Sequence, residues 1–252
     1  MSPWGSYPSQ RRGRTAAGVL LGLGLVCGVC ALLAGPGYRL GWWGLGPGLK
    51  GVTVAGGVAA LLLLLALVGA GLALRRRQGP VLRRWLLAAL VCALTAAPVG
   101  YFGLRATRLP HIHDISTDLD NPPEFVAVLP LRQGAKNPAQ YDAAVAPVQR
   151  QAYADIVPME LAVPSAQAFG RATQVAQAMG WAIVAADPAA LRLEATATTL
   201  LFGFQDDVVI RIRPTATGSR VDMRSLSRVG GSDLGTNAAR IRAFRTRLLA
   251  GN

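Results

Sequence analysis

Three apolar stretches without a single charge constrain this chain of 252 residues more than any other feature. They run from Thr15 to Ala34, from Gly51 to Leu74 and from Trp85 to Leu104. Each has the roughly 20 residues that a helix needs to cross the hydrocarbon core of a bilayer. Three such helices cannot all face water in one small protein. The sequence therefore predicts three membrane-spanning helices and a lipid bilayer as a partner.

The basic residues indicate the orientation of these helices. The N-terminal tail carries three Lys or Arg residues and the loop after the second span carries five, against two in the loop 35–50. Because short cytoplasmic loops retain positive charge, we expect a cytoplasmic N-terminus and an exported C-terminal part. The first stretch can also be read as a cleavable signal, since Arg11, Arg12 and Arg14 precede it. Its length and the two further spans favour an uncleaved helix.

The formal net charge of +13 suggests a nucleic-acid binder until its distribution is considered. All 13 acidic residues lie at or after Asp114, whereas the first 104 residues carry ten basic groups and no acid. The excess charge therefore belongs to the membrane part and reports orientation. We predict no nucleic-acid partner.

Glycines in the first span occur in pairs at four-residue spacing, Gly18 with Gly22 and Gly24 with Gly28. This spacing lets helix backbones approach closely in a membrane. We expect the pairs to pack the protein's own helices, with dimerisation as the alternative.

The sequence after the spans predicts an α+β domain. Strands are expected at 156–163, 181–186 and 191–201 and in a pair joined through Gly218, with helices at 165–179 and 234–250. In 191–201 apolar and polar residues alternate, as in a half-exposed strand. We predict an antiparallel sheet with two helices packed on one face. The expected organisation is a cytoplasmic basic tail at 1–14, a transmembrane region at 15–104, a Pro-rich linker or docking segment at 105–152 and an exported domain at 153–252.

His111 and His113, followed by Asp114, are the first residues that resemble metal ligands. Histidines two apart on an extended segment point the same way, and carboxylates complete many coordination spheres. The chain has no other histidine. A solvated linker is therefore favoured over a metal site, and no cofactor is predicted.

Asp206 and Asp207 are neighbours on a predicted strand, so their side chains point to opposite faces and do not converge for acid-base catalysis. Asp207 shares its face with Arg211 and, on the adjacent strand, Arg224. We expect a solvated charged face with cross-strand ion pairs. A binding surface for an anionic ligand is the alternative.

Between the last strand and the last helix, adjacent glycines lead from Arg228 to Ser232, Asp233 and Asn237. The N-H groups at a helix N-terminus attract anions. However, Ser232 and Asp233 are themselves good helix caps, and a capping carboxylate occupies the position of a bound phosphate. Capping is favoured, and ligand capture stays open.

Two runs in this region resemble a known family. They are Phe202-Gly203-Phe204-x-Asp206-Asp207-Val208-Val209-Ile210-Arg211-Ile212 and Arg224-Ser225-x-Ser227-Arg228-Val229-Gly230-x-Ser232-Asp233-Leu234-Gly235-x-Asn237-x-x-Arg240-Ile241. The chain resembles the domain of unknown function 1499 family over residues 111–250. The resemblance implies a bacterial envelope setting and no established reaction. It adds Asp114 and the stretch Asn121-Pro122-Pro123 as characteristic positions.

Together these observations predict a multi-pass protein of the bacterial cytoplasmic membrane whose exported domain is a binding or accessory module. Its partner would be an envelope protein or an anionic envelope ligand. The candidate ligand-binding residues are Asp207, Arg211, Arg224, Arg228, Ser232, Asp233 and Asn237, with motif positions of unknown role at Asp114, Asn121, Pro122 and Asp206. Ligand binding would be supported if these residues lined one cleft between the last helix and the sheet.

Two other functions stay open. One is an envelope hydrolase or metal-dependent enzyme, which requires folding to bring together His113, Asp114, Asp206, Asp207 and Arg228. The other is a scaffold that holds partner proteins through the charged sheet face.

Overall fold

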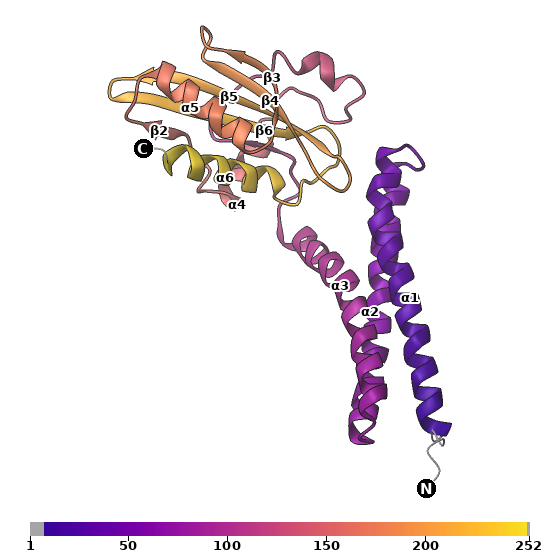
Figure 1. Cartoon of the computed structure of the whole chain (residues 1–252). Helices are drawn as coiled ribbons and strands as arrows, with labels where there is room; N and C mark the ends of the chain where they lie inside the picture. Colours follow the sequence, from indigo (N-terminus) through magenta and orange to yellow (C-terminus); the bar gives the residue numbers. More distant parts are fainter. Residues whose placement is uncertain (1–7, 251–252) are drawn as a thin grey trace. The chain divides into compact units, whose positions relative to one another are not determined.

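The computed structural model of the chain describes residues 8–250 (Figure 1). The chain divides into two compact units. We call residues 1–104 with 201–203 the helical unit, and residues 105–200 with 204–252 the sheet unit.

Three long helices make up most of the helical unit: α1 (Pro8–Arg39), α2 (Leu45–Arg75) and α3 (Gly79–Arg108). Each predicted apolar stretch lies inside one of them. All three helices are long and apolar enough to cross a membrane, which suggests a multi-pass membrane protein in contact with lipid.

The glycine pairs of α1 have different surroundings. A Cβ atom on Gly24 would lie 2.8 Å from Sγ of Cys92 on α3, and one on Gly28 would also meet an α3 side chain, at 3.3 Å. A Cβ on Gly18 or Gly22 would meet nothing within 4 Å. Only the second pair therefore provides the close helix packing that the spacing predicts.

The sheet unit contains the predicted antiparallel sheet. Its strands are β1 (Asp114–Ser116), β2 (Met159–Leu161), β3 (Ala182–Asp187), β4 (Arg192–Thr198), β5 (Gln205–Thr215) and β6 (Gly218–Ser227). The order across the sheet is β1-β6-β5-β4-β3, and β2 also pairs with β6. The remaining elements are η1 (Leu129–Arg132), α4 (Val145–Ala152), α5 (Ser165–Ala178) and α6 (Thr236–Ala250). The α+β class is confirmed.

Helices α5 and α6 cover one face of the sheet, which we call the helix face (Figure 1). Ile241, Phe244 and Leu248 recur at helical spacing in the sequence, and this apolar stripe of α6 is buried in the core. The Trp181 ring stacks on Phe244 with centroids 5.7 Å apart. Alternation along β4, β5 and β6 supplies the other half of the core, because every second side chain points toward the helices.

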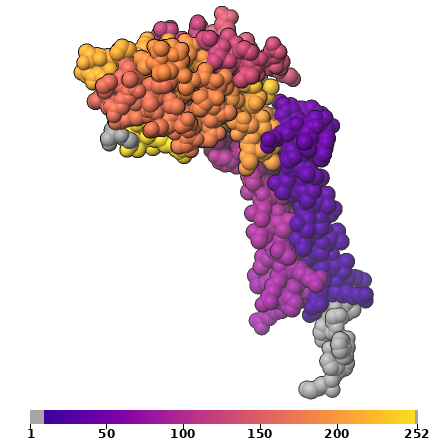
Figure 2. All heavy atoms as spheres, turned by 45° about the horizontal axis from the view of Figure 1, so that its top comes forward, coloured from indigo at the N-terminus to yellow at the C-terminus, as the bar shows by residue number. Residues whose placement is uncertain are grey.

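Residues 117–142, which we call the strap, lie on the opposite face of the sheet. Phe125 and Val128 of the strap form a small apolar cluster with Val209 of β5 and Leu226 of β6. The strap forms the mauve to pink part of the surface in Figure 2. Part of the segment expected to be a linker or docking segment is therefore packed on the sheet, and it also supplies β1.

Candidate functional site

The face under the strap, which we call the polar face, carries most of the charged side chains of the sheet. Asp207 and Arg224 point to it, whereas Asp206 points to the helix face, as the strand alternation predicts. The predicted cross-strand ion pairs are present, and Arg213 and Arg220 are partly exposed, but the prediction of a solvated face is wrong for the side chains under the strap. Asp207, Asp222 and Arg224 are fully buried or nearly so. The strap covers them, and strand alternation alone cannot reveal a cover made by irregular backbone.

Arg224 of β6 forms a bidentate ion pair with Asp114 of β1. Its Nε lies 2.9 Å from Oδ1 and its Nη2 lies 2.7 Å from Oδ2. Nη1 donates to the carbonyl of Pro123 at 3.3 Å, and Nη2 also donates to that of Ala139 at 2.8 Å. Arg224 therefore joins two strands to both ends of the strap, and it has little capacity left for a ligand.

Two strap aromatics surround the same guanidinium. The ring centroids of Phe125 and Tyr141 lie 4.9 and 5.2 Å from the guanidinium carbon of Arg224, within the range of cation–π attraction. Burial, together with the nearby charge of Asp114, raises the pKa of Tyr141 to about 12. The Tyr141 hydroxyl is buried, and no group within residues 8–250 forms a hydrogen bond with it.

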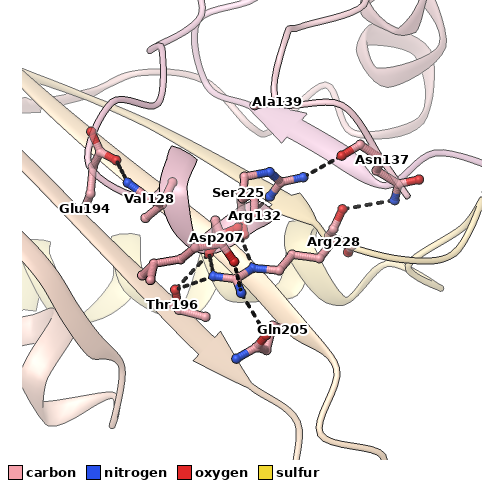
Figure 3. Close-up of polar contacts among 12 residues, drawn as sticks. Val128, Arg132, Asn137, Ala139, Glu194, Thr196, Gln205, Asp207, Ser225 and Arg228 are labelled. Atoms are coloured by element: carbon pink, nitrogen blue, oxygen red, sulfur yellow. Dashed lines mark hydrogen bonds and ion pairs between the residues drawn. The ribbon is translucent and has the colours of Figure 1, made fainter. Parts of the chain in front are cut away.

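Asp207 of β5 accepts from two arginines at once (Figure 3). Arg132 of η1 lies 2.5 Å from Oδ2, while Arg228 donates from Nε to Oδ2 at 2.9 Å and from Nη2 to Oδ1 at 2.8 Å. Thr196 of β4 donates its hydroxyl to Oδ1 at 2.8 Å. Burial lowers the pKa of Arg132, and the bond to Asp207 opposes that shift. This cluster holds one carboxylate and two guanidiniums.

The sequence did not point to Arg132 or Glu194. Glu194 was expected on the exposed side of its strand, and this expectation is wrong: its carboxylate is buried. Its two oxygens accept from the backbone N-H groups of Val126 and Val128 at 2.9 and 3.0 Å. In the sequence, Glu194 is a charged residue on the polar side of its strand. Most such residues are exposed to solvent, so this position gave no sign that the carboxylate is buried.

A third group lies toward the β5–β6 hairpin, and we call it the distal arginine cluster. Its members are Asp118 of the strap, Arg211 and Arg213 of β5, and Arg220 and Asp222 of β6. All three arginines lie within 3.3 Å of both carboxylates, counting the nearest oxygen. Arg211 is the one member among the candidate ligand-binding residues.

Asp118 shows how these charges act on each other. Burial by itself would raise the pKa of Asp118, but the hydrogen bond from Asn121 N and the Arg220 and Arg213 guanidiniums outweigh it and lower the pKa. The carbonyl of Asn121 accepts from Nη2 of Arg211 at 2.7 Å. The motif position Asn121 thus holds the strap against the cluster, and half-buried Pro122 follows it.

A separate polar network lies on the helix face. Asp206 accepts from Arg240 of α6 at 2.6 Å. Arg240 also donates to Asn237 Oδ1, and to Ser225 Oγ at 2.9 Å. Asn237 is buried and accepts from Ser225 at 2.7 Å while donating to Ser227 Oγ at 3.0 Å. These residues fasten the start of α6 to β6.

The N-terminus of α6 is capped by the preceding turn, as expected. The Asp233 carboxylate accepts from the backbone N-H groups of Gly235 and Asn237 at 2.8 and 2.7 Å. The Ser232 hydroxyl accepts from Leu234 N at 3.2 Å. Burial raises the pKa of Asp233 despite these bonds. The position where an anion would bind is therefore taken by the protein's own carboxylate.

His111, His113 and Asp114 do not form a shared centre. The ring of His111 lies against Gly231, His113 Nδ1 lies 3.3 Å from the Gly231 carbonyl, and Asp114 is paired with Arg224. Within residues 8–250, no group of three or more His, Cys, Asp and Glu side chains is arranged to hold a metal ion.

The candidate residues do not line one cleft. Asp207, Arg211, Arg224 and Arg228 lie on the polar face, while Ser232, Asp233 and Asn237 lie at the start of α6. Among the residues of the enzyme hypothesis, Asp207 and Arg228 are brought together as an ion pair, whereas Asp114 pairs with Arg224 and Asp206 pairs with Arg240 on the helix face.

No curated protein is significantly similar to the chain. The model of the family described as "Protein of unknown function (DUF1499)" matches residues 114–248. The match begins at the first residue of β1, includes the whole strap and ends within α6. The polar face with its ion pairs is thus part of the family domain. The chain belongs to the DUF1499 family.

Proposed function

We propose that this protein is a membrane-anchored binding module whose sheet unit lies on the extracytoplasmic side and binds an anionic envelope ligand at the distal arginine cluster. The bias of basic residues toward the N-terminal tail and the α2–α3 loop supports this orientation. The arrangement of the distal arginine cluster supports the ligand class.

In that cluster the acids lie inside and the arginines outside. The Asp222 and Asp118 side chains are 0% and 9% exposed, whereas those of Arg211, Arg220 and Arg213 are 19%, 32% and 38% exposed. Three guanidiniums surround two carboxylates, and Glu160 of β2, which lies opposite Arg220, adds a third acidic charge at the exposed surface. Guanidinium groups bind carboxylates and phosphates through paired hydrogen bonds.

The other arginine clusters are less suited to a ligand. Arg224 is buried and bound to three strap or strand acceptors, and Arg132, the last residue of η1, is buried as well. In the described part of the chain, Arg213 donates only through Nη2, so its other N-H groups are available. Arg213 is therefore the residue on which ligand binding should depend most.

Calorimetry on the full chain in nanodiscs tests the ligand class, with inorganic polyphosphate as the anionic probe. We expect Arg213→Gln to weaken binding about tenfold, because it removes the most exposed charged donor of the cluster. Arg247→Gln on α6 removes the same charge elsewhere and should bind like the wild type. Equal losses in both variants, or no binding by the wild type, would contradict the proposal.

A reporter fused after Asn252 tests the orientation. A reporter that is active only after export should be active, and one that is active only in the cytoplasm should be silent. The reverse pattern would place the sheet unit in the cytoplasm.

A further inference from the structure

The loop between β4 and β5, residues 199–204, reads Thr-Leu-Leu-Phe-Gly-Phe. No charged residue occurs between Glu194 and Asp206. Leu200 is 92% exposed and Leu201 is 41% exposed. Among the described large apolar side chains, the next most exposed is Leu94 at 68%, which belongs to a candidate membrane helix. A leucine side chain this exposed is more favourable in contact with lipid than in contact with water.

The register of the sheet shows at which end this loop lies. Thr198 pairs with Gln205, Asp206 pairs with Ser227, and Leu226 pairs with Asp114, the first residue of β1. The loop and the point where the chain enters the sheet are therefore at the same end. The β5–β6 hairpin forms the opposite end (Figure 1).

The chain enters at that end directly from α3. Only residues 109–113 separate α3 from β1. The last turn of α3 also packs within the sheet unit, because a Cβ on Gly235 would lie 2.9 Å from Arg105 and 3.0 Å from Leu109. Strands lie about 4.8 Å apart, so the three steps from β1 to β4 span about 14 Å. So short a connection keeps this end of the sheet close to the last turn of α3, which is a candidate membrane helix.

Two further exposed leucines lie at the same end. Leu129 and Leu131 belong to η1 and are exposed. The carbonyl of Leu131 accepts from Arg228 at 2.7 Å, and Arg228 also donates to Gln205, the residue that follows the loop. Exposed apolar side chains from two separate segments therefore lie at the end of the sheet where the chain enters from α3.

We infer that the tip of the β4–β5 loop inserts through Leu200 into the interfacial layer of the same bilayer that α1, α2 and α3 cross. Leu and Phe are common on protein segments that bury an apolar face at this depth, and the loop ends on Phe202 and Phe204. The occupant of the exposed apolar tip is thus lipid. The inference rests on the membrane anchoring of the proposed function and is independent of its anionic ligand.

Spin labelling of the full chain in nanodiscs tests this contact. A label is placed at Leu200→Cys, after Cys27, Cys30 and Cys92 have been replaced by alanine. The control label is placed at Thr217→Cys, on the exposed turn at the opposite end of the sheet. Collisions of each label with oxygen, which concentrates in lipid, and with a water-soluble nickel chelate are then compared.

We expect the label at 200 to collide more with oxygen and less with the chelate than the label at 217. Chelate collisions at 200 that match those at 217 would show a loop in water and overturn the inference. Protection of 200 from both reagents would show a loop buried against protein and would overturn it too. Neither result bears on polyphosphate binding, so the two proposals can fail separately.

Discussion

Both faces of the sheet have a covering layer, but the two layers differ, and the polar face stays partly exposed at the distal arginine cluster. The helix face is covered by α5 and α6 through an apolar core in which side chains such as Leu193, Ile210 and Phe244 are buried. The polar face is covered by the strap, whose apolar contribution is mainly Phe125 and Val128. Most of its attachment consists of ion pairs and hydrogen bonds.

Because of this difference, different kinds of substitution should destabilise the two faces. Apolar packing loses stability in proportion to the volume removed. A buried ion pair contributes little net stability compared with an apolar pair, yet removing one partner leaves an uncompensated charge. The free energy of unfolding should therefore fall most when a charge is removed from the polar face, and when side-chain volume is removed from the helix face.

The largest expected effect is at the Arg224 pair. Arg224→Met should lower the free energy of unfolding by about 3–5 kcal/mol, because Asp114 is left buried without a counter-ion. Chemical denaturation measures the change. The double variant Arg224→Met with Asp114→Asn should be more stable than the single one, since the unpaired charge is gone. A double variant less stable than Arg224→Met would show that charge is not the cause.

On the helix face, Leu193→Ala should lower the free energy of unfolding by about 2–5 kcal/mol through the cavity it leaves. Leu193→Met keeps the volume and should cost less than about 1.5 kcal/mol. The same denaturation experiment compares them. Similar losses in both variants would mean that this face is sensitive to shape rather than volume.

A smaller effect is expected at Glu194. Glu194→Gln keeps one acceptor for the two strap N-H groups, so the cost should be about 1–3 kcal/mol. Hydrogen exchange at Val126 and Val128 should become faster, because the strap is loosened locally. Glu160→Gln, an exposed acid on β2, should change stability by no more than about 0.5 kcal/mol. Unchanged exchange at both amides would contradict the attachment role of Glu194.

The smallest effect at neutral pH is expected for Tyr141→Phe, which removes a buried hydroxyl that has no hydrogen-bond partner among the described residues. Because the folded-state pKa of Tyr141 is raised from 10.0 to about 12, its contribution to stability is present below pH 10 and is lost as the pH rises toward 12. The wild type should therefore lose more stability than Tyr141→Phe between pH 10 and 12. Parallel pH profiles of the two proteins would exclude this titration.

The sequence by itself determined the parts that rest on local periodicity. Charge-free stretches such as Gly51 to Leu74 are helices, the stripe through Phe244 is buried, and Asp206 and Asp207 point to opposite faces. Capping by Asp233 was also predictable, because it involves backbone N-H groups only a few residues away. These features depend on residues that are close along the chain.

Only the tertiary structure decided which polar residues are buried and with what partner. Arg132 reaches Asp207 across 75 positions, and Arg224 reaches Asp114 across 110. The strap that encloses these pairs has no repeating pattern, so nothing along β4, β5 or β6 indicates that it is there. An alternating strand looks the same whether its polar side faces water or a covering segment, because the alternation records which side is polar and not what lies above it.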